Sequence, residues 1–211
     1  MLQFGNRSIL AVDCFFRGGA NSVIYSNNNT FVKLLSCHID GDGGSFNSDA
    51  GINLFNANNP NVVIVDCLIQ GCGGDGIGAR TGGNFGSFTI LNNTLVDNSG
   101  CGLQLDDEGT SSDPSPVKDA VIMNNLSAFN GTYGFKTPST VAGRWQMVEC
   151  SVWAGNATFG NTSGAYDGQI ASSISGVTLS VDPFTDRAGG DYSLNSTSGG
   201  GADCSDAAST S

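Results

Sequence analysis

The chain has few charged residues, very few of them basic, and no long hydrophobic segment. Only 13% of its 211 residues are charged, and 8 Lys and Arg against 19 Asp and Glu give a formal net charge of −11. Because phosphates and anionic lipids are bound by clustered Lys and Arg, nucleic acid and membrane surfaces are excluded as expected partners. No apolar run approaches the length that spans a bilayer, so membrane insertion is not expected either.

Other common signals are also missing. The N-terminal residues MLQFGNRSIL contain neither the basic nor the apolar region of a secretory signal peptide. No Cys-x-x-Cys or Cys/His spacing suits zinc, so no metal ligands are assigned. The one histidine, His38, has no identifiable acid or nucleophile partner, and we interpret it as a surface residue.

The sequence does contain a repeated unit. Each copy has an apolar strand, a two-residue polar corner, a short strand, a turn rich in Gly and Asn, and a Gly-apolar step; the clearest copies are TILNNTLVDNSGCGLQLD and VIMNNLSAFNGTYGFK. The residue after the corner recurs every 23 to 32 residues, at Cys14, Cys37, Cys67, Thr94, Leu126 and Cys150. Such steps, without a helical pattern between strands, predict one solenoid turn per step.

The alternation of apolar and polar residues predicts which side chains face the interior. After the Gly-apolar step the predicted inward residues are Ile52, Ile77, Leu103 and Phe135. After the corner they are Cys14/Phe16, Cys37/Ile39, Cys67/Ile69, Thr94/Val96, Leu126/Ala128 and Cys150/Val152. Before the corner they are Ile9/Ala11, Val32/Leu34, Val62/Ile64, Thr89/Leu91, Val121/Met123 and Trp145/Met147. Asn and Asp suit the corner itself, and stacked Asn side chains are expected to bond along the solenoid axis.

The cysteines follow the repeat. Four of the seven, Cys14, Cys37, Cys67 and Cys150, share one place in the unit, which predicts an inward stack of small apolar thiols rather than disulfides. Cys72 and Cys101 lie in the turns of neighbouring copies and form the one plausible bridged pair, while the state of Cys204 stays open. The sequence thus predicts a single domain over residues 1–200 and a flexible C-terminal tail over residues 201–211.

These residues resemble the right-handed parallel β-helix of the pectate-lyase-like superfamily. The resemblance lies in ILNNTLVDNSGCGLQL and IMNNLSAFNGTYGFK, and in the ending VDPFTDRAGGDYSLNSTSGGGA, and covers roughly residues 8–200. It implies an all-β fold, a single-stranded right-handed parallel β-helix of about six to seven turns. Members usually begin with a cap over the open end of the core, whereas this chain enters a strand almost at once. Earlier turns, or a covering partner chain, are therefore expected at that end.

The resemblance also implies a ligand groove across the strand that follows the Gly-apolar step. Its candidate catalytic residues here are Asp75, Arg80, Asp106 and Lys136, and its candidate substrate-binding residues are Asn53, Gln104, Tyr133 and Glu108. A polysaccharide lyase would use Arg80 and Lys136 as the positive groups beside a uronate. A glycoside hydrolase would use a carboxylate pair such as Asp75 and Asp106.

Two further features have open interpretations. The runs Asp106-Asp107-Glu108 and Asp40-x-Asp42 offer oxygens for Ca²⁺, or are solvated acids in turns of an acidic protein. Phe129 and Trp153, predicted to point outward, would stack on sugar rings or form an oligomer contact.

Two functions are therefore expected. The first is an extracellular, carbohydrate-facing module that binds, and in one version cleaves, a polysaccharide. The second is a non-catalytic structural or adhesive module, such as part of a phage tail or surface fibre, with a homo-oligomer (a trimer) or a covering partner chain. The first places the protein outside the cell and the second on a virion or cell surface. The sequence leaves open whether the chain is an enzyme, because the fold hosts many activities.

Overall fold

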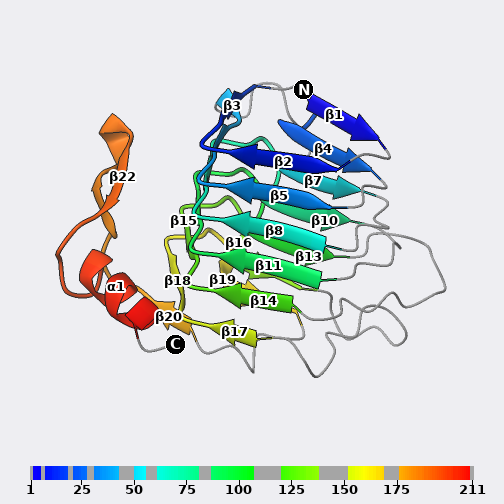
Figure 1. The fold of residues 1–211 in the computed structure, drawn as a ribbon. Helices are drawn as coiled ribbons and strands as arrows, with labels where there is room; N and C mark the ends of the chain where they lie inside the picture. Colours follow the sequence, from blue (N-terminus) through cyan, green and yellow to red (C-terminus); the bar gives the residue numbers. More distant parts are fainter. Residues whose placement is uncertain are drawn as a thin grey trace.

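The computed structural model describes residues 2–5, 8–18, 21–27, 31–42, 50–55, 61–80, 87–106, 120–137, 152–168 and 176–209. Three parallel sheets run along the molecule, and consecutive strands of the repeats belong to different sheets (Figure 1). The predicted fold class, an all-β parallel solenoid, is confirmed. The described part of the chain contains no helix long and apolar enough to cross a membrane.

The repeated unit contributes one strand to each sheet. Sheet A contains β1 (Leu2–Gly5), β4 (Ile24–Asn27), β7 (Ile52–Phe55), β10 (Ile77–Arg80), β13 (Leu103–Asp106), β16 (Tyr133–Lys136) and β19 (Gly164–Asp167). Sheet B contains β2 (Ile9–Val12), β5 (Val32–Leu35), β8 (Asn61–Val65), β11 (Ser87–Leu91), β14 (Ala120–Met123) and β17 (Val152–Ala154). Sheet C contains β3 (Phe15–Arg17), β6 (His38–Asp40), β9 (Leu68–Gln70), β12 (Thr94–Val96), β15 (Leu126–Ala128), β18 (Asn156–Phe159) and β20 (Gly176–Thr178).

Most of the predicted inward residues form the core. The residues of the Gly-apolar step are fully buried, as are the inward pairs of β5 and β8: Ile52, Ile77, Leu103, Phe135, Val32, Leu34, Val62 and Ile64. Cys37 and Cys67 are buried free thiols in one column, which confirms the predicted stack for those two positions. Burial raises the pKa of the Cys67 thiol to about 12, so this side chain stays protonated at neutral pH.

The predicted register is wrong by one residue in the two copies with Asn-Asn corners. Asn92 and Asn124, with φ of 55° and 57°, occupy the left-handed corner position that Asp66 occupies in the preceding coil. The residues stacked on Cys67 are therefore Asn93 and Asn125 rather than Thr94 and Leu126. Both Asn residues of each corner tolerate a left-handed conformation, so local preference alone did not choose between them.

The shift changes which neighbours face the core. In sheet C the inward residues are Leu95 and Ser127, both fully buried and in register with Ile69 of β9. In sheet B they are Phe88, Ile90, Ala120 and Ile122 rather than the pairs predicted from Thr89 and Val121.

The last predicted copy, residues 145–153, is also placed differently. Val152 and Trp153 lie in β17 of sheet B, where Trp153 packs edge-on against Phe135 at 6.2 Å between ring centroids. Gly155 takes the corner and Asn156 the column of Asn125. Trp153 thus faces the core rather than solvent. Trp145, Met147 and Cys150 lie outside the described residues.

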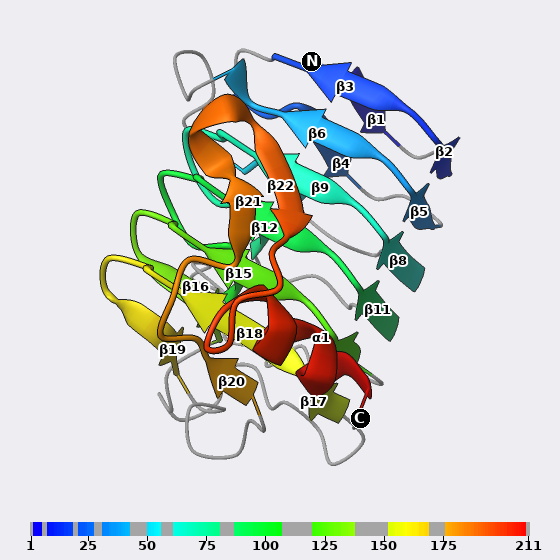
Figure 2. The ribbon, with the colours of Figure 1, turned by 90° about the vertical axis from the view of Figure 1, so that its left-hand side faces the viewer.

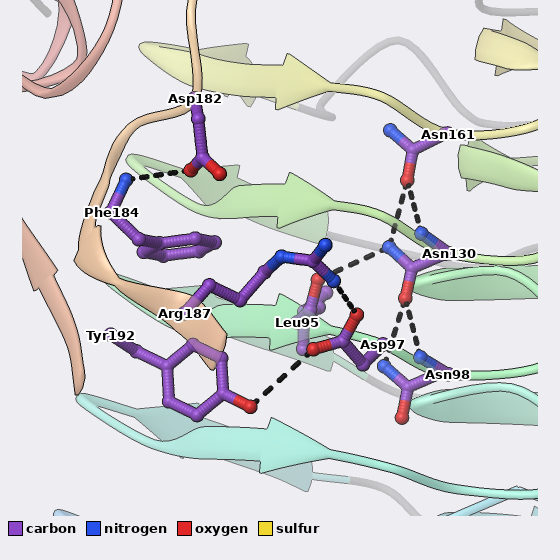
Figure 3. A network of polar contacts seen from close by, with 9 residues as sticks. All are labelled: Leu95, Asp97, Asn98, Asn130, Asn161, Asp182, Phe184, Arg187 and Tyr192. Carbon is purple, nitrogen blue, oxygen red and sulfur yellow. Dashed lines mark hydrogen bonds and ion pairs between the residues drawn. The ribbon is translucent and has the colours of Figure 1, made fainter. Parts of the chain in front are cut away.

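Two ladders of asparagine amides run along the interior. In the first, Asn93 Nδ2 donates to Asn125 Oδ1 and Asn125 Nδ2 donates to Asn156 Oδ1, each at 2.9 Å. In the second, Asn98, Asn130 and Asn161 repeat the pattern at 3.0 and 2.9 Å (Figure 3). The predicted stacking of Asn along the axis is confirmed, because each amide pairs with the next coil.

Each ladder ends at a cysteine. Asn93 Oδ1 accepts the backbone N–H of Cys67 at 2.9 Å, and Asn98 Oδ1 accepts that of Cys72 at 3.1 Å. Cys72 therefore lies in the column of Asn98, while Cys101 Sγ contacts Thr132 Oγ1 at 3.0 Å. Cys72 and Cys101 are both free, so the predicted disulfide between them is wrong.

Replacing Cys67 by asparagine is expected to stabilise the protein by about 1 kcal/mol. The new amide would donate to Asn93 Oδ1 and to Leu34 O, and would accept the Cys37 N–H that now reaches only the thiol at 3.4 Å. Urea unfolding monitored by circular dichroism measures the change. Cys67→Ser, which is of similar size but has no amide, is the control and should not stabilise; equal midpoints for both variants would contradict ladder extension.

Residues 179–209, here called the C-terminal cover, lie on the outer face of sheet C (Figure 2). They include β21 (Phe184–Asp186), the 3-10 turn η2 (Arg187–Gly189), β22 (Asp191–Leu194), which pairs antiparallel with β21, and α1 (Gly201–Ser209). A tail was predicted for residues 201–211, and of these, residues 201–209 form α1. The cover buries outward residues of sheet C, namely Val96, Leu126, Ala128 and Ala157.

Two corner residues hold the cover in place. Asp97 and Phe129 have positive φ, 56° and 55°, although left-handed backbone costs a residue with a side chain about 1–2 kcal/mol. Asp97 accepts hydrogen bonds from Arg187 Nη1 at 2.6 Å and Tyr192 OH at 3.4 Å (Figure 3). The Arg187 guanidinium lies 3.7 Å from the centroid of the Phe129 ring. The strained corners therefore present the side chains that bind the cover.

Candidate functional site

The predicted groove corresponds to the outer face of sheet A. One row of this face, here called the sheet A row, is in register across six strands and consists of Tyr25, Asn53, Gly78, Gln104, Lys136 and Asp167. The inward neighbours of Asn53, Gly78 and Gln104 along their strands are apolar and buried, as the period of two requires. Successive members are therefore separated by about 4.8 Å, the spacing of hydrogen-bonded strands.

Residues in the middle of the sheet A row are buried, and those toward its ends are partly exposed. Asn53 and Gln104 are only 3% and 4% exposed, although both project outward. Tyr25, Lys136 and Asp167 are partly exposed. Within the described part of the chain, Asn53 Oδ1 is a buried acceptor without a hydrogen-bond donor. A buried amide oxygen in this state costs about 1–3 kcal/mol.

Asp75 is not part of this row. It is 2% exposed, and its Oδ1 accepts the backbone N–H of Cys101 at 2.7 Å. The carboxylate lies so close to Gly100 that a Cβ there would collide with it. Asp75 therefore ties two coils together in the structure, and it is Asp106, not Asp75, whose strand position borders the sheet A row.

The remaining candidates are brought together only in part. Arg80 and Asp106 occupy paired positions on β10 and β13, and Gln104 pairs with Lys136. The positions of Arg80 and Lys136 are two strands and two residues apart, roughly 12 Å from strand geometry. Tyr133 begins β16 opposite Gly164, away from the sheet A row. Glu108 lies outside the described residues.

Sheet B presents a different outer surface. Most outward positions of its strands form two rows in register, and Asn61 and Ser87 form a further outward pair on β8 and β11. The two rows are Leu10, Lys33, Val63, Thr89, Val121 and Val152, and Val12, Leu35, Val65, Leu91, Met123 and Ala154. Lys33 is the one charged residue among these twelve described positions, and its Nζ lies 5.5 Å from the Phe31 ring centroid. The polar groups on this face are those of Lys33, Asn61, Ser87 and Thr89, and the other ten outward positions are apolar.

The outer face of sheet C carries polar residues on β3 and β6, together with Gln70 on β9 and Thr94 on β12. His38 stacks edge-on against Phe15 at 4.8 Å between centroids, and lies on the outer row between Phe15 and Leu68 as predicted. Burial lowers the pKa of His38, an effect that the nearby Asp40 carboxylate opposes. The imidazole is therefore neutral at physiological pH.

Asp40 and Asp42, one of the two acidic runs considered for Ca²⁺, lie beside an arginine. Arg17 Nε lies 3.5 Å from Asp40 Oδ2, and its guanidinium also donates to Asp42. Asp42 is held in turn by its backbone N–H, which donates to Asp40 Oδ1 at 2.9 Å. Across the described residues, His, Cys, Asp and Glu form no group of three or more suited to a metal ion. Asp107 and Glu108 lie outside those residues.

The fold defines the protein as a parallel β-solenoid. The outer face of sheet A is polar, that of sheet B is mostly apolar, and that of sheet C is partly buried by the C-terminal cover. A family model for the right-handed β-helix region matches residues 2–115, just over half of the chain, so the protein belongs to that family. The match agrees with the resemblance to the pectate-lyase-like superfamily. No curated protein and no solved structure gives a significant match.

The sequence analysis did not identify Tyr25 and Asp167, the residues at the two ends of the sheet A row. Tyr25 precedes the first clear Gly-apolar step, and Asp167 follows a Gly164-Ala165 step whose second residue is small. The tripeptides Ala165-Tyr166-Asp167 and Gly134-Phe135-Lys136 are in register. Aligning these two tripeptides in the sequence would have identified Asp167 as a row residue.

Proposed function

We propose that this β-helix is an extracellular module that binds a polysaccharide along the outer face of sheet A. The observation that carries the proposal is the contrast between the three faces. The described outer face of sheet B is mostly apolar, and part of the outer face of sheet C is buried by the C-terminal cover. The sheet A row combines a partly exposed aromatic ring, ammonium and carboxylate, which are groups that bind sugar rings and sugar hydroxyls, with two carboxamides that are nearly buried.

Charge favours a neutral glycan over a polyuronate. The chain carries a net charge of −11, and the sheet A row pairs Lys136 in register with Asp167. A polyanion would be repelled by the whole molecule and attracted by a single row cation. Neutral sugars lose nothing to this field and still gain hydrogen bonds from the partly exposed Lys136 and Asp167.

Binding without cleavage is the simpler part of the proposal. A hydrolase needs two carboxylates about 5 to 9.5 Å apart across the bond that breaks. Asp75 is bound to the backbone of the next coil, which leaves Asp106 without its expected partner. A lyase needs a base beside a cation, whereas the positions of Arg80 and Lys136 are separated by two strands.

Affinity electrophoresis and calorimetry with a panel of neutral and uronate polysaccharides test the proposal. We expect one neutral polymer to bind and Lys136→Met to weaken that binding several-fold, because the ammonium lies on the row. Lys33→Met removes the same charge from sheet B and is the matched control. Equal loss in both variants, or no binding across the panel, would overturn the proposal.

The same polymers also report on cleavage. Absorbance of unsaturated products detects a lyase, and release of reducing ends detects a hydrolase. We expect neither with the bound polymer. Product formation that requires Asp106 would instead assign catalysis to this face.

A second candidate function, a structural or adhesive module, is favoured by the first coil. Its strands β1, β2 and β3 each lie at the end of their sheets, and Leu10 and Phe15 are 63% and 59% exposed. Apolar side chains beside unpaired strand edges are suited to a covering partner chain. Absence of glycan binding together with a trimer in light scattering would support this alternative.

A further inference from the structure

The outer face of sheet B has the composition of a buried surface. Ten of its fourteen outward positions are apolar, and the four polar ones are Lys33, Asn61, Ser87 and Thr89. At its ends Leu10, Val12 and Val152 are 63%, 48% and 45% exposed. Monomeric proteins rarely expose a contiguous apolar area of several hundred Å², and such areas mark interaction sites.

The chain's own C-terminal cover does not use this face. Helix α1 and the β21–β22 hairpin pack on sheet C, with Phe184 and Leu179 in the cluster over Val96 and Leu126. In Figure 1 the strands β2, β5, β8, β11, β14 and β17 lie side by side as one layer, on a different side of the solenoid from that hairpin.

We infer that two copies of this chain pair through the outer faces of sheet B, about a two-fold axis parallel to the solenoid axis. A flat face with regular rows is complementary to itself, which a two-fold interface requires. In this arrangement each strand lies opposite the same strand of the second copy and runs in the reverse direction. The sheets then stack about 10 Å apart, as in a β-sandwich.

The charged residues at sheet B favour this axis over a two-fold axis parallel to the strands. Lys33 lies on β5, and the exposed acids Asp13 and Asp66 occupy the corners that follow the neighbouring strands β2 and β8. Reversing the strand direction brings each Lys33 toward the Asp13 and Asp66 corners of the other copy. An axis parallel to the strands would instead place Lys33 over Val121, where burying an unpaired ammonium costs several kcal/mol.

The size of the face predicts a weak, reversible dimer. Six strands about 4.8 Å apart, with three to five residues each at about 3.3 Å per residue, cover roughly 400 Å² per copy. The total of about 800 Å² is below the range of stable complexes, so a dimer that forms only at high protein concentration is expected. Pairing leaves the sheet A row open on both copies, and it does not depend on glycan binding.

Sedimentation velocity of the full chain from 1 to 500 µM tests the inference. We expect a concentration-dependent shift from monomer to dimer. Val65→Glu, which places a carboxylate between Leu35 and Leu91 in the centre of the face, should weaken dimerisation at least tenfold. Val181→Glu is the matched control, because Val181 is 40% exposed on the C-terminal cover, and should leave the dissociation constant unchanged. Circular dichroism verifies that both variants fold.

A charge exchange tests the orientation. Lys33→Glu should abolish the dimer by setting carboxylates against Asp13 and Asp66, and adding Asp66→Lys to it should restore at least part of the affinity. A monomer at 500 µM, a trimer, or a Val65→Glu variant that pairs like the wild type would overturn the inference. Because Val65→Glu leaves the sheet A row untouched, glycan binding measured on it separates a failure of this inference from a failure of the proposed function.

Discussion

Replacing Asn125 by leucine is expected to lower the free energy of unfolding by about 3–5 kcal/mol, because it leaves several buried polar groups without partners. Asn125 Oδ1 accepts both the backbone N–H and the Nδ2 of Asn93, and Asn125 Nδ2 donates to Ile90 O and Asn156 Oδ1. Leucine has nearly the same shape but supplies none of these bonds, so the loss is electrostatic rather than steric.

Asn92→Gly is the matched control for this change. Asn92 is the exposed neighbour of a ladder residue and has a φ of 55°, a conformation that glycine adopts without strain. We expect its unfolding free energy to stay within a few tenths of a kcal/mol of the wild type. Urea titrations followed by far-UV circular dichroism provide the comparison, and a loss below about 1 kcal/mol for Asn125→Leu would contradict a stabilising ladder.

Replacing Phe135 by alanine is expected to cost about 3–5 kcal/mol by leaving a cavity in the core. Phe135 is fully buried, stacks on Tyr166 at 5.6 Å between ring centroids and meets Trp153 edge-on. Removing the ring would also loosen the packing of Trp153, so a red shift of tryptophan emission should accompany the lower midpoint. Burial raises the pKa of Tyr166 to about 12, and the variant should bring that pKa closer to its ordinary value.

Phe15→Ala is the control for the cavity. It removes the same ring from a position that is 59% exposed, where little apolar surface was taken from water. An effect under about 1 kcal/mol is expected there. Similar losses for Phe15→Ala and Phe135→Ala would mean that the core does not depend on the Phe135 ring.

Period-two alternation predicted the core correctly wherever only one side of a strand is apolar. The Gly-apolar steps at Ile52, Ile77 and Leu103 are examples, since each has a polar residue or glycine on its other side. The same rule failed on β12 and β15. Leu95 faces the core and Val96 faces the cover, so both sides of the strand are apolar and the alternation carries no information about direction.

The candidate site was predicted as a line of positions but not as a set of available side chains. Asn53, Gln104 and Lys136 lie in register as expected, because strand pairing follows from the repeat. The repeat does not show which outward side chains are buried in the folded protein, and Asn53 and Gln104 are nearly inaccessible. Asp75 was predicted as catalytic, and its hydrogen bond to Cys101 depends on a contact between coils that spacing does not show.

The amino-acid sequence by itself determined the solenoid, its corners and the inward residues of sheet A, because these depend on contacts between equivalent positions of neighbouring repeats. Only the tertiary structure decided which asparagine of each corner enters the ladder, and that residues 179–209 bury the outer face of sheet C. Both depend on side chains that meet across distant segments: Asn125 with Asn156, and Asp97 with Arg187. The local sequence pattern does not predict such contacts, because asparagine and aspartate are equally compatible with a solvated turn.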